Sequence, residues 1–142
     1  MSRAKEPQSI EVRLLGGATS GLASILQQYL EQQLAESGDR RARAARIRGR
    51  LALTATDYGV AVTVDFGGGE IAIWDGALEP FDASIAGPYA ALTELIQGRT
   101  NPLIEHLRGR LKVSSKLRNP FLPLRLHKLM RLGPEQALYG GR

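Results

Sequence analysis

The stretch from Asp82 to Val113 reads DASIAGPYAALTELIQGRTNPLIEHLRGRLKV and passes from an alternating pattern to a helical one and back. Apolar and polar residues alternate over 81–85, which is typical of a short half-buried strand. The apolar period then becomes helical, and the helix starts at Pro88 and ends at Gly98. The first half of the stretch therefore predicts a strand followed by a helix.

A shorter helix and another strand complete this stretch. Asn101 can cap the helix, because its side chain accepts hydrogen bonds from N–H groups that lack a partner in the first turn. Pro102 fixes a helical φ at a position where no N–H donor is needed, and Gly109 ends the helix. Residues 110–114 alternate again and predict a strand.

Three further strands are expected upstream. Alternation over 47–56, 60–66 and 70–75 predicts them, and the sequences DYG at 57–59 and GGG at 67–69 supply the turns between them. Strands joined by such short turns pair most simply as an antiparallel meander.

Helices are expected near both ends of the chain. Apolar residues recur at helical spacing over 22–34. The pair Asn119 and Pro120 repeats the start signal of the short helix and predicts a last helix over 120–132. Five strands with one apolar face each, together with these helices, predict an α+β two-layer sandwich. The sheet is expected to be mainly antiparallel, with all helices on one face.

The other face of the sheet is expected to meet water and to collect basic side chains. These are Arg46, Arg48, Arg50, Arg110 and Lys112. The whole chain, 1–142, is expected to form a single domain, with flexible ends over 1–9 and 134–142.

The composition excludes several classes of protein. The 142 residues contain no cysteine and only two histidines, so neither a disulfide framework nor a zinc site is expected. No apolar run approaches the ~20 residues of a membrane span, and no signal-peptide core follows the N-terminus. A cytoplasmic protein is therefore expected.

Charge is strongly segregated along the chain. The net charge of +5 is distributed as +4 over 1–50, −7 over 51–98 and +8 over 99–142. Six arginines lie between Arg40 and Arg50, and both basic segments suit an anionic membrane surface or an acidic protein partner. No aromatic residues are interleaved to stack bases, so nucleic acid is the less favoured partner. A purely solvated face is the plain alternative.

The order of signals after Asp82 resembles the sterol carrier protein type-two domain. In that family an Asp-strand-helix unit leads into a Gly-x-x-Asn-Pro element, matched here by Gly98-Arg99-Thr100-Asn101-Pro102. A Gly-Lys/Arg-Leu-x-Val/Ile strand then follows, matched by Gly109-Arg110-Leu111-Lys112-Val113. Two features depart from the family pattern. Ser114-Ser115 stands where a glycine is common, and the apolar segment 10–15 has no evident counterpart.

The resemblance implies a non-catalytic carrier that holds a fatty acyl chain, phospholipid, sterol-like molecule or prenyl lipid in an apolar cavity between sheet and helices. It implies no metal and no organic cofactor. Residues whose apolar faces point between the layers are the candidate walls of this cavity, although such residues often serve only to pack a core. They are Val64, Phe66, Ile85, Leu92, Leu95, Leu103, Leu107, Leu122, Leu126, Leu129 and Met130.

Two other functions stay open. The domain could be an accessory protein that presents a prenylated quinone precursor to biosynthetic enzymes, a role of some relatives, or a basic module that binds nucleic acid or protein. An enzyme is not expected, because His106 and His127 belong to no His-Glu-x-x-His motif and no Gly-x-Ser-x-Gly motif is present. The oligomeric state and the identity of the ligand are not encoded in these patterns.

Overall fold

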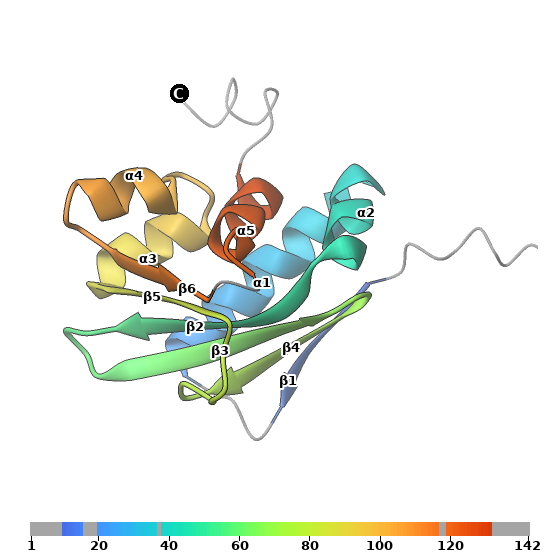
Figure 1. Ribbon diagram of the computed structural model, residues 1–142. Helices are drawn as coiled ribbons and strands as arrows, with labels where there is room; N and C mark the ends of the chain where they lie inside the picture. Colours follow the sequence, from blue (N-terminus) through green and yellow to red (C-terminus); the bar gives the residue numbers. More distant parts are fainter. Residues whose placement is uncertain (1–9, 16–19, 37, 117–118, 132–142) are drawn as a thin grey trace, which may run out of the picture.

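A computed structural model describes residues 10–15, 20–36, 38–116 and 119–131 (Figure 1). The expected flexible ends, 1–9 and 134–142, lie outside the described residues. The elements in chain order are β1 (Glu11–Leu15), α1 (Gly21–Glu36), α2 (Gly38–Arg46), β2 (Arg48–Ala55), β3 (Val60–Gly67), β4 (Glu70–Asp75), β5 (Ala83–Gly87), α3 (Tyr89–Ile96), α4 (Pro102–Leu107), β6 (Lys112–Ser115) and α5 (Leu122–Met130).

The described strands form one mixed sheet in the order β1-β4-β3-β2-β5-β6. The predicted meander is confirmed, since β2, β3 and β4 pair antiparallel, and β5 pairs antiparallel with β6. The pairs β2/β5 and β1/β4 are parallel. The α+β architecture is as expected, but the prediction of five strands was wrong, because β1 adds a sixth at one edge. Its five residues are too few to show a period of their own, and it pairs with a strand far along the chain.

The described helices cover one face of the sheet (Figure 1). Helix α1 packs over β1, β3 and β4, while α3 and α5 pack over β2 and β5. The side chains between the layers form one apolar cluster, to which β2 contributes Leu51 and Leu53 and α1 contributes Leu26 and Leu30, all almost fully buried. Burial of this apolar surface is the main force that holds the layers together.

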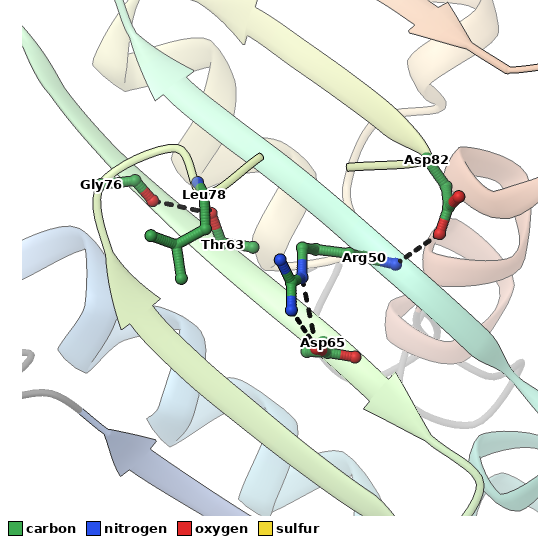
Figure 2. A network of polar contacts seen from close by, with 6 residues as sticks. All are labelled: Arg50, Thr63, Asp65, Gly76, Leu78 and Asp82. Atoms are coloured by element: carbon green, nitrogen blue, oxygen red, sulfur yellow. Dashed lines mark hydrogen bonds and ion pairs between the residues drawn. The ribbon is translucent and has the colours of Figure 1, made fainter. Parts of the chain in front are cut away.

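The sequence suggested that the face opposite the helices is open to water, but part of this face is covered. The connection from β4 to β5 crosses it, because β4 lies on one side of the β2–β3 pair and β5 on the other. Thr63 points to this face and is fully buried beneath the connection. Its Oγ1 donates to the Gly76 carbonyl at 2.7 Å and accepts from the Leu78 N–H at 2.9 Å (Figure 2).

The basic residues expected on the open face behave differently from one another. Arg48 and Lys112 are exposed, and Arg50 lies on this face in an ion pair with Asp65 at 3.2 Å (Figure 2). The predictions for two others were wrong. Arg46 is the last residue of α2, because the segment before β2 is rich in helix-forming alanine and arginine. Arg110 precedes β6 and turns toward the helices, where carboxylates attract it.

The two Asn-Pro pairs have different roles. Asn101 caps α4 as predicted, since its side chain accepts hydrogen bonds from the Leu103 and Ile104 N–H groups. The expected cap at Asn119 is wrong. Phe121 occupies the cap position of α5, and the Asn119 amide donates to the Arg48 carbonyl at 2.8 Å. Asn119 therefore ties the start of α5 to the start of β2.

Candidate functional site

Nine of the eleven candidate wall residues come together between the layers. Strands β3 and β5 and helices α3 and α5 supply them, and each is at most 2% exposed. They are Val64, Phe66, Ile85, Leu92, Leu95, Leu122, Leu126, Leu129 and Met130. The period-two and period-3.6 patterns therefore place these side chains in one continuous apolar region, as expected.

Leu103 and Leu107 lie outside that region. Both belong to α4, where their exposed fractions are 49% and 78%. The short helix instead turns Pro102 and Glu105 inward. With Ile104, which is 46% exposed, the two leucines give α4 an outward apolar face. Sequence spacing alone did not distinguish the two faces of so short a helix.

An open groove of about 500 Å³ lies where α4 and β6 approach β5. Its lining consists of Thr56, Ala86, Gly87, Pro88, His106, Gly109, Arg110, Leu111 and Lys112. None of the eleven candidate wall residues takes part. Gly87 is needed here, because a Cβ at this position would overlap the Leu111 side chain and the Arg110 carbonyl. Only the tertiary packing of α4 against β6 creates this groove.

A second groove, of about 280 Å³, lies between α2 and α5. Its lining consists of Ile47 and four cations, namely Arg43, Arg46, Arg125 and Lys128. Both basic segments were evident in the sequence, but their proximity was not, because only the fold brings residues 43 and 125 together. This juxtaposition concentrates positive charge at one point of the surface.

A network of ion pairs fixes α4 against α3. The Glu105 side chain is only 4% exposed, and Arg110 Nη1 lies 3.1 Å from its Oε1. Arg110 Nη2 also contacts Glu94 of α3 at 3.1 Å. If α4 moved away from Arg110, the buried Glu105 carboxylate would lose the charge that compensates it, at a cost in free energy. The network therefore favours a single position for α4.

The two histidines occupy structural positions. His106 Nδ1 accepts a hydrogen bond from the Val113 N–H at 3.0 Å, which links α4 to β6. Partial burial lowers the pKa of His127, and the charges of Arg131 and Lys128 lower it further. A hydrogen bond with the Thr100 backbone raises this pKa but does not reverse the direction of the shift. Among the described residues, no group of three or more His, Asp or Glu side chains could hold a metal ion, and no helix is long and apolar enough to cross a bilayer.

The sheet, the helical layer and the Gly98-to-Val113 elements together define a sterol-carrier type of domain. The sequence pattern of the SCP-2 sterol transfer family matches residues 26–116, and the chain belongs to this family. No curated protein sequence matches the chain.

Solved structures agree with this assignment. A crystal structure of sterol carrier protein 2 is 27% identical, with a TM-score of 0.51 over 80% of this chain and 95% of that one. A conserved hypothetical protein from Thermus thermophilus, described as possibly a sterol carrier protein, is 25% identical, with a TM-score of 0.51 over 82% and 90%. The UbiJ-SCP2 ubiquinone synthesis protein shares the fold at 15% identity, with a TM-score of 0.60 over 77% and 92%.

Proposed function

We propose that this protein binds and carries hydrophobic ligands between its sheet and its α3 and α5 helices, without catalysing a reaction on them. The observation that carries the proposal is the apolar region of nine predicted wall residues, found in a chain of the SCP-2 sterol transfer family. The ligand classes that this proposal covers are fatty acyl, phospholipid, sterol-like and prenyl lipids. The cytoplasmic location expected from the sequence is part of this proposal.

The hydrophobic effect would supply the binding energy. Burying roughly 300 Å² of an acyl chain contributes about 7 kcal/mol, part of which is lost to the entropy of association. Because apolar walls select ligands by volume and length, broad tolerance for ligand chemistry is expected.

Uptake would require the helical layer to open. The nine wall residues pack against one another, so a ligand must displace α5 or α3 from the sheet. The outward apolar face of α4, with Leu103 and Leu107, borders this layer and offers a first contact for a lipid or a membrane surface. In this proposal the two leucines guide the ligand at the entrance and do not line the interior.

The test uses the full chain after removal of co-purified lipid. A fluorescent fatty acid is titrated in, and bound lipid from untreated protein is extracted and weighed by mass spectrometry. Saturable uptake is expected, with methyl NMR shifts at Ile85 and Met130 and none at Ile10, which directly precedes the edge strand β1, separated from β5 by three strands. Failure of both uptake and extraction would exclude a carrier.

An accessory role in quinone synthesis is the second candidate. It is favoured by the shared fold of the UbiJ-SCP2 ubiquinone synthesis protein. In this case the protein would present a prenylated precursor to membrane-associated enzymes. Co-purification with such enzymes, dependent on a prenylated ligand, would support this role, whereas a free carrier would exchange ligand without them.

A further inference from the structure

The groove between α2 and α5 has a charge arrangement that differs from the rest of the basic surface. Arg43 and Arg46 are three residues apart on α2, and Arg125 and Lys128 are three residues apart on α5. This spacing directs each pair to one face of its helix, and the two faces line the same groove. Four positive side chains therefore converge on a volume of about 280 Å³.

The other two arginines of α2 do structural work and hold the groove in shape. Arg40 Nη2 donates to the Arg131 carbonyl at 2.8 Å, just after the end of α5, and Arg40 also contacts Gln33 and Glu36. Arg41 Nη1 donates to the Leu34 carbonyl of α1 at 2.7 Å. Helix α2 is thus attached to both α5 and α1, and the distance between the two cationic faces is constrained.

Within the described part of the chain the four groove cations have no such partners, and none of their side chains forms an ion pair or a hydrogen bond. Glu36, an acidic residue of the preceding helix, pairs with Arg40 instead. Like charges brought together raise the energy of the folded state, and a bound anion removes this cost.

We infer that this groove binds a phosphate-bearing group. Guanidinium groups bind phosphate oxygens in a bidentate way, and lysine adds a point charge, so donors from two helices suit a tetrahedral anion better than a single planar carboxylate. The buried Ile47 provides an apolar wall on the core side. A phosphomonoester or diphosphate satisfies these features, whether it is the head group of a lipid or a soluble molecule. The inference stands independently of whether the interior takes up lipid.

The test compares two double variants of the full chain. Arg46→Gln with Arg125→Gln removes one guanidinium from each side of the groove. The matched control, Lys112→Gln with Lys116→Gln, removes the same charge from exposed positions in and just after β6. Two ligands distinguish the sources of phosphate: inorganic pyrophosphate in solution, followed by NMR and calorimetry, and phosphatidylcholine vesicles with or without phosphatidic acid.

The groove variant is expected to weaken phosphate binding about thirtyfold, since two charge-assisted contacts are lost, while the control changes it less than about threefold. Loss confined to phosphatidic acid vesicles assigns the site to lipid head groups, and loss of pyrophosphate binding assigns it to soluble phosphates. Equal weakening in both variants would overturn the inference, because general charge would explain it. Absence of binding to the unmodified protein would overturn it as well.

Discussion

Asp82 shows how a single residue of the family pattern acts on the fold. Its Oδ2 accepts a hydrogen bond from the Arg50 N–H at 3.0 Å (Figure 2). Its own N–H donates to the Arg50 carbonyl at 2.7 Å. Its carbonyl accepts from the Lys116 N–H at 2.7 Å. Asp82 thus joins β2, the start of β5 and the end of β6, and its role is structural.

Gly98 is constrained by both conformation and space. Its φ is 79°, in the left-handed region that favours glycine. A Cβ at this position would also overlap the Met130 carbonyl oxygen at the end of α5. The glycine of the Gly-x-x-Asn-Pro element therefore lets the α3–α4 connection pack directly against the last helix.

His127 makes the stability of the protein dependent on pH. Because burial and the neighbouring Arg131 and Lys128 lower its folded pKa, the unfolded state binds a proton first as the pH falls through about 6.5. The free energy of unfolding should therefore decrease from pH 7.5 to pH 5, and it should decrease less in His127→Gln. Chemical denaturation at the two pH values measures the difference. An NMR titration midpoint for His127 at or above 6.5 would contradict this.

At the scale of elements, the start of α4 depends on one cap. Asn101→Ala removes the acceptor for two N–H groups and should lower the free energy of unfolding by about 1 kcal/mol. Asn101→Asp keeps a capping oxygen and should retain most of the stability. Urea unfolding of both variants tests the assignment, and equal destabilisation by Ala and Asp would show that the side chain serves another purpose.

The strongest sequence patterns were sufficient to predict most strands of the sheet. Alternation predicted β2, β3 and β4, because each has one face in the core and one away from it. Alternation did not predict β1, whose partner β4 is distant in the chain. The helix α2 was not predicted either, because its arginine-rich sequence contains few apolar residues that could show a helical period. The Asn-Pro signal was correct at 101 and wrong at 119, because a tertiary contact with Arg48 engages the second amide.

At the scale of the whole molecule, the crossover between β4 and β5 covers part of the sheet. Thr63 anchors it through two hydrogen bonds to its backbone. Thr63→Val keeps the shape but leaves the Gly76 carbonyl and the Leu78 N–H without this partner, at a cost of about 2 kcal/mol or more. Thr63→Ser, which keeps the hydroxyl, should cost less. Urea unfolding ranks the two variants, and a Val variant as stable as the original would show that the hydroxyl is dispensable.

For the strands and the longer helices, the local sequence by itself determined which apolar side chains would lie between the layers, because periods of 2 and 3.6 are properties of the backbone geometry. It did not do so for the short helix α4. The local sequence also determined the family, through the Gly-x-x-Asn-Pro and Gly-Arg-Leu elements. Tertiary structure decided which surfaces meet. The exposed face of α4, the groove beside β6 and the four cations between α2 and α5 all depend on contacts between distant segments, and no periodicity within one segment encodes them.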